Sequence, residues 1–499
     1  MDLKILRRQS LKKESLWHKT AAVPAFSPLS EELRTDVAVI GGGIAGILTA
    51  FELTRRGVRC AVLEAGRILS GQTGNTTAKI TSQHGLIYDK LIDTLGFEHA
   101  RAYAAANEKA ISDYGRIASE RKIDCEFKTL PSYVYSAKNA EYLKKEAESA
   151  ASLGIASSFV TDVMLPFPTA GAVRFENQAQ FHPLKFLTSL LPGLEIYENT
   201  EVLSAKGNKI KTNRSVVTAE KLVFATNFPP INFPGLYFAK MHRERSYVVA
   251  LDGAPMLGGI YYGADEDGLS LRNAGSGLLL LGGAGHRTGE NRRGGRYAAL
   301  HTAAERFFPG SRVVCEWSAQ DCMPADSVPY IGRYSKSEPD WYVATGFQKW
   351  GMTSAMVSAM LLSDLICGKK NPYEAVFSPE RKLSGSSVPQ LVSDGAKSAK
   401  SIAARIFYLP GKDFREIAPG HAGIVWVGGH RRGVYREILP DGKTKLHVVS
   451  VKCPHLGCEL AWNPDEKSWD CPCHGSRFDI DGNLLDGPSQ TGIGIGRKA

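Results

Sequence analysis

Near the start of the chain, the pattern of apolar and polar positions predicts a strand, a glycine-rich turn, a helix and a second strand. Residues 36–40 (Asp-Val-Ala-Val-Ile) form a short apolar run of the kind found in buried parallel strands. Three glycines follow, and the residues from Ile44 to about Arg56 have the composition of a helix. Residues 58–64 are again apolar and predict the next strand. This order indicates a βαβ unit.

The middle of the chain changes character twice. Residues 84–155 are rich in Ala, Glu, Lys and Tyr and predict helices. Between 197 and 285, short strand-like runs alternate with turns, for example at 221–225 and 278–281. A last helix is expected at 353–366, with Gly368 suited to its C-terminal cap.

The C-terminal part of the chain predicts a separate small domain. Residues 378–401 are rich in Ser, Pro, Gly and Lys without a sustained period, which is typical of a linker. Short strands separated by turns follow and predict an all-β domain, at 423–427, 433–437 and 447–450. We therefore expect four parts: a basic N-terminal segment, a large α/β region, a linker and a β domain, at 1–34, 35–377, 378–404 and 405–499.

Composition and charge narrow the partners and the compartment. The chain has 499 residues, of which 43% are hydrophobic, an ordinary share for a soluble globular protein. The net charge is +10, and basic residues gather near the start: Lys4, Arg7, Arg8, Lys12, Lys13 and Lys19. The run at 7–12 resembles a twin-arginine export signal, but polar residues follow it where export needs an apolar stretch. Since no run approaches the roughly 18 apolar residues of a membrane span, we expect a cytoplasmic protein without a transmembrane segment. No aromatic-and-basic stripe suggests nucleic acid.

The glycine turn has the spacing G-x-G-x-x-G, with Gly41, Gly43 and Gly46 at the glycine positions. The first glycine permits a tight turn, the second lets the backbone approach a pyrophosphate, and the third lets the helix pack on the strand. Glu64 ends the second strand and could accept a hydrogen bond from a ribose hydroxyl. Two other glycine clusters, at 282–285 and 492–496, lack a third glycine or a following helix. One dinucleotide site is therefore expected, without a choice between NAD and FAD.

Resemblance makes that choice. The chain from about Trp17 to Gly368 resembles the glycine/D-amino-acid oxidase (DAO) superfamily of FAD enzymes, through residues 36–64, 222–227, 344–347 and 351–353. The resemblance implies a Rossmann-like FAD domain interleaved with an antiparallel-sheet substrate domain. It further implies that FAD contacts residues outside the glycine turn, with the late Gly-Phe…Gly segment along the flavin ring: Thr73 in the loop 71–79, Val202, Ala225, Gly346, Phe347, Gly351 and Met352. Thr73 and Thr77 could equally be turn residues.

Four of the nine cysteines fall between 453 and 473, beside two histidines. The loops C-x-H and C-x-x-H, 453–455 and 471–474, have the spacing of a Rieske cluster. Cys453 and Cys471 would then hold one iron, while His455 and His474 would hold the other. Zinc is the main alternative, because Cys and His at short spacing also form tetrahedral sites. Zinc does not account for six Cys and His positions in two glycine-flanked loops.

The segment from about Arg405 to Ala499 resembles the Rieske subunits of respiratory cytochrome bc complexes. That resemblance implies a disulfide between Cys458 and Cys473, and a hydrogen bond from Ser476 to a bridging sulfide. Phe478 stands where those subunits carry a tyrosine, so one donor to a cysteine sulfur is missing. We therefore expect a lower reduction potential than in the respiratory proteins.

Together the two resemblances imply a dehydrogenase. A small substrate, most simply an amine or amino acid, would reduce FAD, and a Rieske [2Fe–2S] cluster would pass electrons singly to an external acceptor. The lysine that sarcosine-oxidase-like members use for the substrate carboxylate is Thr353 here. Lys349, Arg272 and His286 are the candidates to replace it. No lysine occupies the run around Leu279, where those oxidases carry a lysine that promotes reaction with oxygen.

Other functions stay open from the sequence. The chain could be a redox sensor or electron-transfer protein without turnover, or an amine oxidase that uses oxygen directly. A Rieske oxygenase would need a mononuclear iron site with two histidines and a carboxylate, and no such grouping stands out in the sequence. A respiratory Rieske subunit would need a membrane anchor.

Overall fold

The computed structural model describes residues 13–382 and 413–495, together with 390, 392–393, 395–397 and 401; of Ser276 only the backbone is described. The twin-arginine-like run, most of the predicted linker and the boundary predicted at 404/405 lie outside the described residues. No helix in the part of the chain that the structure describes is long and apolar enough to cross a membrane.

By its internal contacts the chain divides into two compact units. The first comprises residues 1–235, 246–284 and 297–386, and the second comprises 236–245, 285–296 and 387–499. The second unit therefore contains the C-terminal β domain and two short segments from much earlier in the chain. These two segments lie at the ends of strands that begin or finish in the first unit.

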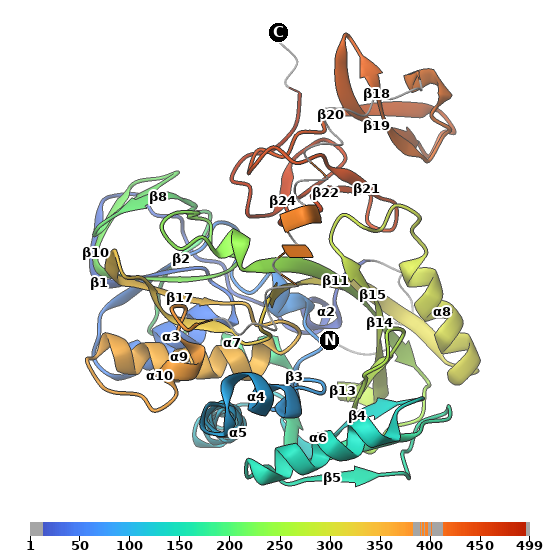
Figure 1. Ribbon diagram of the computed structural model, residues 1–499. Coiled ribbons are helices and arrows are strands. Elements are labelled where there is room, and N and C mark those ends of the chain that lie inside the picture. The colour runs from blue at the N-terminus through green and yellow to red at the C-terminus, as the bar shows by residue number, and fades with distance from the viewer. Residues whose placement is uncertain are drawn as a thin grey trace. The chain divides into compact units, whose positions relative to one another are not determined.

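The first sheet of the first unit contains the predicted βαβ unit (Figure 1). Its strand order is β16-β17-β10-β1-β2-β7, and a β8-β9 hairpin joins through β9 and β10. Strands β17, β10, β1, β2 and β7 run parallel. The bounds are β1 Leu33–Ile40, β2 Cys60–Leu63, β7 Glu195–Tyr197, β8 Val202–Lys206, β9 Lys209–Thr212, β10 Val216–Asn227, β16 Tyr330–Ser335 and β17 Glu338–Thr345.

The second sheet is formed by the strands that the first sheet leaves out, so the two sheets alternate along the chain. Its order is β15-β11-β14-β13-β12-β4-β6-β3, with β5 paired to β6. The pairs β12–β13, β13–β14, β3–β6, β4–β6 and β5–β6 are antiparallel, whereas β12 and β4 run parallel. The bounds are β3 Lys79–Ile80, β4 Lys128–Ser136, β5 Ser157–Val160, β6 Gly171–Gln180, β11 Met241–Asp252, β12 Ile260–Gly263, β13 Ser270–Ala274, β14 Leu278–Arg287 and β15 Arg312–Pro324.

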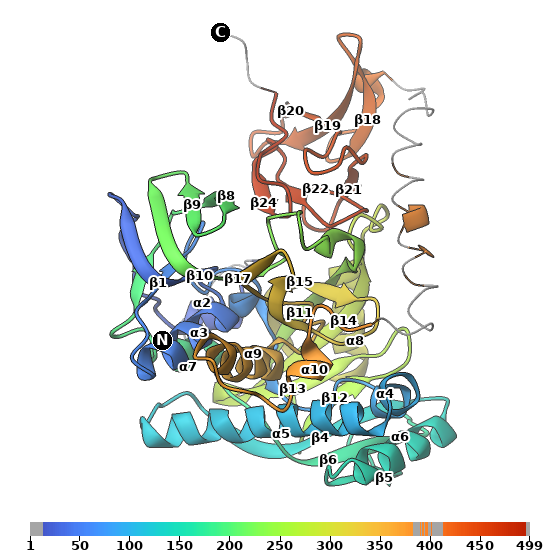
Figure 2. The same ribbon diagram turned by 60° about the vertical axis from the view of Figure 1, so that its left-hand side comes forward.

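Helices cover these sheets, and α9 packs against both α3 and α5 (Figure 2). The sheet alternation confirms the expected interleaved fold. The prediction of helices throughout 84–155 is wrong for residues 128–136, which form β4 because they pair with β6 on one side and with β12 on the other. The helices are α2 Leu16–Thr20, α3 Ile44–Arg55, α4 Tyr88–Leu95, α5 Phe97–Glu120, α6 Ala140–Ser152, α7 Pro183–Thr188, α8 Arg296–Phe307, α9 Gly351–Ile366 and α10 Glu374–Phe377.

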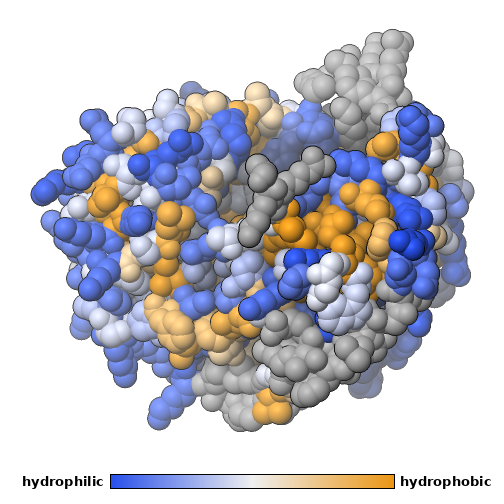
Figure 3. All heavy atoms as spheres, turned by 90° about the horizontal axis from the view of Figure 1, so that it is seen from above, coloured by the Kyte–Doolittle hydropathy of each residue, from blue (hydrophilic) through white to orange (hydrophobic). Residues whose placement is uncertain are grey.

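The C-terminal β domain has two small sheets, of order β18-β19-β20 and β21-β22-β23-β24. Its core holds Trp469, Phe478 and four cysteines, and this confirms the predicted all-β domain. Hydrophilic residues cover most of the face of the molecule in Figure 3, with apolar residues gathered between them. The bounds are β18 Ala422–Val427, β19 His430–Ile438, β20 Thr444–Ser450, β21 Ala461–Asn463, β22 Ser468–Asp470, β23 Arg477–Phe478 and β24 Leu484–Asp486.

Candidate cofactor sites

Four segments implied in FAD binding meet at one edge of the first sheet. Ile40, the last residue of β1, lies in register with Leu63 of β2 and Phe224 of β10, and Phe224 lies in register with Val343 of β17. Because these strands are parallel, the residues that follow each of them gather at the same carboxyl edge. The turn at Gly41, the carboxylate of Glu64, Ala225 and Gly346 therefore come from neighbouring positions.

The glycines of the turn are required by its geometry. Gly41 has a φ of +109°, and a side chain there would meet the carbonyl oxygen of Ala225 at 2.5 Å. A Cβ on Gly46 would lie 1.9 Å from the carbonyl oxygen of Gly41. A Cβ on Gly43 would meet a single atom of the described residues within 4 Å, the Thr73 hydroxyl oxygen at 3.2 Å. The turn is thus closed on the strand side and open beside Gly43, where the helix α3 begins and its free N–H groups favour an anion. This geometry fits a bound pyrophosphate.

Glu64 ties the turn to the next loop. Its two carboxylate oxygens accept hydrogen bonds from the backbone N–H groups of Gly42 and Gly66, both at 2.8 Å. Burial raises the pKa of Glu64, while these two N–H groups act in the opposite direction. A carboxylate has about four acceptor positions, so two hydrogen bonds to backbone leave capacity for ribose hydroxyls. Ribose binding by Glu64 stays a prediction.

The loop 71–79 packs beside the start of α3. The Thr73 hydroxyl accepts a hydrogen bond from the N–H of Ile44 at 2.9 Å, so Thr73 caps the helix that follows the glycine turn. From the other side, α2 holds the loop, because the indole N–H of Trp17 donates to the carbonyl of Thr76 at 2.6 Å. Trp17 is fully buried. The N-terminal residues from Leu16 onward are thus part of the core beneath this loop.

The late Gly-Phe…Gly segment connects β17 to α9. Gly346 has a φ of +74°, and Gly351 begins α9 with Met352 as its second residue. The Met352 carbonyl accepts a hydrogen bond from the Tyr114 hydroxyl at 2.9 Å, which fixes the first turn of α9. Val202 begins β8, two residues after Thr200, whose N–H donates to the carbonyl of Glu64. Contact of these residues with FAD stays a prediction.

The three candidate substrate-binding residues have different surroundings. Arg272 is buried in β13, where its guanidinium donates to the backbone carbonyls of four residues, which are Thr77, Ala78, Phe181 and Asn273. This pattern indicates that Arg272 holds the loop 71–79 in place. His286 belongs to the second unit, and its Nδ1 bonds the carbonyl of Arg287 at 2.7 Å. Lys349 lies half-buried in the segment before α9.

The Thr353 side chain is also committed. Its hydroxyl donates to the Thr81 carbonyl at 3.1 Å and lies 3.0 Å from Nε2 of His84. The His84 ring stacks on Trp350 with centroids 5.2 Å apart, and burial lowers the pKa of His84 to about 3. Thr353 and His84 therefore form a hydrogen-bonded pair in which the imidazole is neutral.

The sequence reasoning missed Lys79 as a functional candidate. Lys79 is buried in β3, and its ammonium donates to the hydroxyls of Thr77, at 3.1 Å, and Ser270. Burial lowers the pKa of Lys79 to about 7, and the neighbouring charges of Arg272 and Lys349 act in the same direction. Its position at the end of the loop 71–79, which the resemblance places near the flavin, could have marked Lys79 as a candidate. The sequence of that loop could not show that Lys79 is buried.

The second candidate site is formed by two loops of the β domain that share one backbone pattern. In the first, the N–H of Cys453 donates to the Cys458 carbonyl, and the N–H of Gly457 donates to the Cys453 carbonyl, both at 2.9 Å. In the second, the N–H of Cys471 donates to the Ser476 carbonyl at 2.8 Å, and the N–H of Gly475 donates to the Cys471 carbonyl at 3.0 Å. Gly457 and Gly475 have φ values of +81° and +78°, so each loop needs its glycine.

These loops bring together the four predicted cluster ligands. The thiols of Cys453 and Cys471 form a hydrogen bond, which lowers the pKa of Cys453 and, together with burial, raises that of Cys471. The imidazole rings of His455 and His474 lie 4.9 Å apart at 84°, and burial lowers the pKa of His455 to about 4. Paired thiols and neutral imidazoles are the donor set of a Rieske [2Fe–2S] cluster, and the four residues fit that group.

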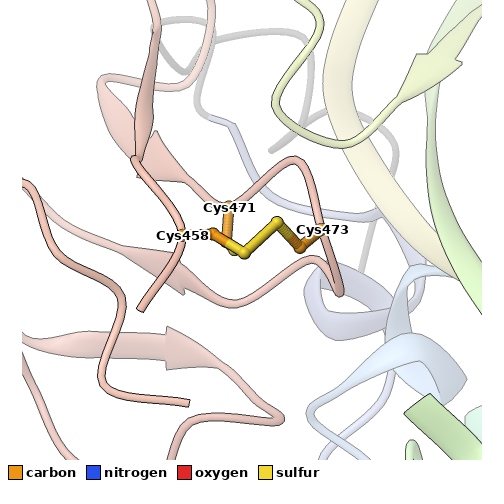
Figure 4. A group of neighbouring side chains, drawn as sticks. All are labelled: Cys458, Cys471 and Cys473. Carbon is orange, nitrogen blue, oxygen red and sulfur yellow. A yellow bond between two sulfur atoms is a disulfide. The ribbon is translucent and has the colours of Figure 1, made fainter. Parts of the chain in front are cut away.

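A disulfide joins the two loops between Cys458 and Cys473. Figure 4 shows Cys471 beside this bond. The three cysteine sulfurs lie within 4.8 Å of one another, a spacing that a metal ion could bridge. Two of them are oxidised to the disulfide and offer no thiolate. Among the described residues, no histidine belongs to such a tight group, and this spread of ligands favours a two-iron cluster over one zinc ion.

Ser476 lies where it can donate to the cluster. Its hydroxyl contacts the sulfur of Cys453 and accepts a hydrogen bond from the N–H of Ser489 at 3.0 Å. Because the hydroxyl oxygen of Ser476 accepts this hydrogen bond, its own proton points elsewhere. The Ser476 hydroxyl can therefore still donate to a sulfur atom, as predicted. Phe478 is fully buried in the domain core and offers no hydroxyl.

Replacing Ser476 with alanine should lower the reduction potential of the cluster and leave the cluster in place. A hydroxyl donor stabilises the reduced, more negative form, so its loss should shift the midpoint downward by about 60 mV, equivalent to a tenfold change in a one-electron equilibrium. Redox titration followed by EPR measures this shift. A midpoint that stays the same or rises would contradict the hydrogen bond.

Comparisons with known proteins bear on both sites. Residues 36–365 match the family model of the FAD dependent oxidoreductases (DAO), and residues 410–495 match that of the Rieske [2Fe-2S] domain. The chain is 39% identical over 494 residues to the putative Rieske 2Fe-2S iron-sulfur protein YhfW of Bacillus subtilis, covering 95% of this chain and 96% of that protein. A cytochrome b6-f complex iron-sulfur subunit of Cyanophora paradoxa is 25% identical over 131 residues, which cover 26% of this chain and 51% of the subunit.

Solved structures resemble the flavoprotein part of the fold. Glycine oxidase from Geobacillus kaustophilus aligns with a TM-score of 0.61 and 20% identity, over 70% of this chain and all of that one. L-proline dehydrogenase from P. horikoshii gives a TM-score of 0.58 and 19% identity, over 70% of this chain and 97% of that one. The family implies FAD and the C-terminal domain implies a [2Fe–2S] cluster. The chain therefore belongs to the DAO family of FAD-dependent oxidoreductases and carries a Rieske [2Fe–2S] domain at its C-terminus.

Proposed function

We propose that this oxidoreductase is a dehydrogenase for a small amine or amino acid that bears a carboxylate, and that its electrons leave singly to an external acceptor. Oxidation of a C–N bond removes two electrons and two protons from the substrate and leaves an imine, which water hydrolyses to a carbonyl compound and ammonia or an amine. Bound FAD would supply the two-electron acceptor, and the Rieske cluster a one-electron carrier. The structural relatives named glycine oxidase and L-proline dehydrogenase support this substrate class.

The chain's own residues would hold these groups in separate places. The turn at 41–46 and the N-terminus of α3 would bind the pyrophosphate, and Glu64 would bind the ribose. Gly346, Phe347 and the start of α9 would lie along the flavin. Cys453, Cys471, His455 and His474 would ligate the cluster.

The buried side chain of Lys79 is the observation that supports a substrate with a carboxylate. A buried ammonium is costly unless a negative charge compensates it. The pKa of Lys79 is lowered by burial and by two further cations, Arg272 and Lys349. A substrate carboxylate would supply the missing charge. Lys79 ends the loop 71–79, and Lys349 lies two residues after Phe347. Both lysines therefore come from segments that the family resemblance places near the flavin. Lys79 would orient the substrate through its carboxylate, in place of the lysine that Thr353 replaces.

Replacing Lys79 with methionine should weaken the binding of carboxylate substrates by about 30-fold or more, the equivalent of ~2 kcal/mol for one partner of a buried charge pair. In the unaltered protein, the affinity should fall as the pH rises through about 7, since Lys79 binds an anion only while it is protonated. Lys79→Arg should bind with little dependence on pH in this range, because arginine stays charged.

Anaerobic titration checks these expectations. Loss of the oxidised flavin absorbance is followed with a panel of amino acids, each paired with the corresponding amine that lacks the carboxylate. Lys145→Met is the matched control, because Lys145 lies on the surface in an ion pair with Asp89. Equal affinity for amino acid and amine in the unaltered protein would contradict the role of Lys79.

The order of reduction tests the electron path. With a substrate from the panel, flavin absorbance should fall first under nitrogen and the EPR signal of the reduced cluster should appear afterwards. Fast aerobic turnover with stoichiometric peroxide would instead indicate an oxidase that uses oxygen directly. No flavin reduction by any member of the panel would favour a redox sensor.

A further inference from the structure

Besides the C-terminal β domain, the second compact unit contains two segments from much earlier in the chain. Residues 236–245 include the 3₁₀ turn η2 (Tyr237–Ala239) and the first residues of β11, while residues 285–296 begin with the last residues of β14. The contacts that place them in this unit are made with the cluster loops and with the residues around them. We call residues 236–245 the cap segment.

An aromatic ring of the cap segment lies against both predicted histidine ligands. The ring of Phe238 meets that of His474 edge-on, with centroids 5.6 Å apart and planes at 89°. It meets His455 at 6.0 Å and 81°. Since the two imidazoles are themselves 4.9 Å apart, the three rings form one compact group. Phe238 therefore lies against both imidazole rings, of which that of His474 is buried and that of His455 half-buried.

Arg243 anchors the cap segment to the second cluster loop. Its side chain is 1% exposed, and it packs so closely on Gly475 that a Cβ there would lie 2.6 Å from Cδ of Arg243. The guanidinium pairs with Asp486 at 3.0 Å and donates to the Gly487 carbonyl. Gly475 is thus required twice, for its positive φ and for the room that Arg243 takes.

A second anchor comes from Arg245, which pairs through two nitrogens with the carboxylate of Glu466. Both residues are nearly buried. Two-point pairing between arginine and a carboxylate fixes orientation as well as distance. The cap segment is therefore held at both Arg243 and Arg245, beyond the ring of Phe238.

The other segment supports the cap from its side. The N–H of Thr288 donates to the carbonyl of Arg243 at 3.0 Å. Gly289 lies against Pro472, between the ligand Cys471 and the disulfide residue Cys473, so that a Cβ on Gly289 would be 2.6 Å from the proline nitrogen. The Asn291 amide donates to Asn463 and Asp465, at 3.0 and 2.8 Å.

We propose that the cap segment is a built-in cover for the imidazole edge of the cluster, with Phe238 as the positioning residue that keeps water and external electron carriers away from His455 and His474. The acceptor would then take electrons through another surface. Reduction adds one electron and one negative charge to the cluster, and a shielded environment disfavours that charge. The cap should thus keep the potential lower than in an uncovered cluster. This inference rests on the proposed cluster ligands.

The test uses the full-length protein loaded with both cofactors. The reduced cluster is examined by EPR power saturation, with and without a soluble gadolinium chelate that speeds the relaxation of exposed paramagnetic centres. Phe238→Ala removes the shield, and Phe238→Leu keeps an apolar cover. Ile438→Ala is the control, because Ile438 is an exposed apolar residue at the end of β19 in the same unit. Redox titration of each protein gives the midpoint.

The chelate should leave the unaltered protein, Phe238→Leu and Ile438→Ala little changed, and should speed relaxation in Phe238→Ala at least twofold. The midpoint of Phe238→Ala should rise by about 59 mV, a tenfold change in the one-electron equilibrium. Strong relaxation by the chelate in the unaltered protein, or no difference between it and Phe238→Ala, would overturn the cap. If Phe238→Ala loses its cluster, the unaltered protein and Phe238→Leu still decide the question. The absence of any Rieske EPR signal in the unaltered protein would instead contradict the cluster ligands.

Discussion

Replacing Cys471 with serine should remove the [2Fe–2S] cluster and leave FAD bound. Cys471 lies in the core of the C-terminal β domain, whereas the glycine turn at 41–46 lies in the core of the first unit. Because the two cores are separate, loss of the cluster should not disturb flavin binding. Reduction of a one-electron protein acceptor should fall by at least about 100-fold, beyond the 10–100-fold that a lost supporting residue costs.

Iron analysis, flavin release and EPR measure this outcome. The unaltered protein should contain about two irons and one FAD, and Cys471→Ser should contain FAD alone. Cys367→Ser is the matched control, because Cys367 is a free, partly exposed cysteine at the end of α9. Unaltered iron content in Cys471→Ser, or stoichiometric zinc in place of iron in the unaltered protein, would show that the site is not a Rieske cluster.

The sequence predicts best the segments whose structure is determined by residues that lie close together in the chain. The strand–turn–helix from β1 to α3 and the two cluster loops each span a few residues, and their spacing reflects the turn itself. The Cys458–Cys473 disulfide, implied by resemblance, is present. Gly368, expected at the cap of the last helix, has a φ of +70° and follows Cys367, the C-cap residue of α9.

The prediction failed or was silent where a residue's environment comes from distant parts of the chain. The composition of 84–155 as a whole is typical of helices, but residues 128–136 within it pair with β6 and β12 and form a strand. Lys79 is an ordinary lysine in sequence, and it becomes unusual only because Ser270 and Arg272 of β13 surround it. Nothing near Phe238 or Arg243 marks them as neighbours of residues more than 200 positions later.

The same difference explains the catalytic candidates. Arg272, His286 and Lys349 were chosen for their charge and chain position. The guanidinium of Arg272 is occupied by backbone carbonyls. A sequence cannot reveal this, because these partners lie in the loop 71–79, directly after β6 and in β13. Lys349 keeps its place among the candidates, now together with Lys79.

Replacing Gly46 with alanine should abolish most FAD binding while the cluster stays intact. The added Cβ would lie 1.9 Å from the carbonyl oxygen of Gly41, closer than any non-bonded contact permits. Either the turn or α3 must move, and both supply the N–H groups expected to face the pyrophosphate. Overpacking of this kind costs about 1–3 kcal/mol, so FAD affinity should fall roughly 10- to 100-fold. Gly115→Ala is the matched control, because Gly115 lies within the helix α5 of the same unit and its Cβ would only touch the ring of Phe127 at 3.4 Å. FAD content after purification and flavin fluorescence quenching on reconstitution measure the affinity, and the EPR signal of the cluster reports on the C-terminal domain. If Gly46→Ala purified with full FAD, the pyrophosphate would have to bind elsewhere than this turn.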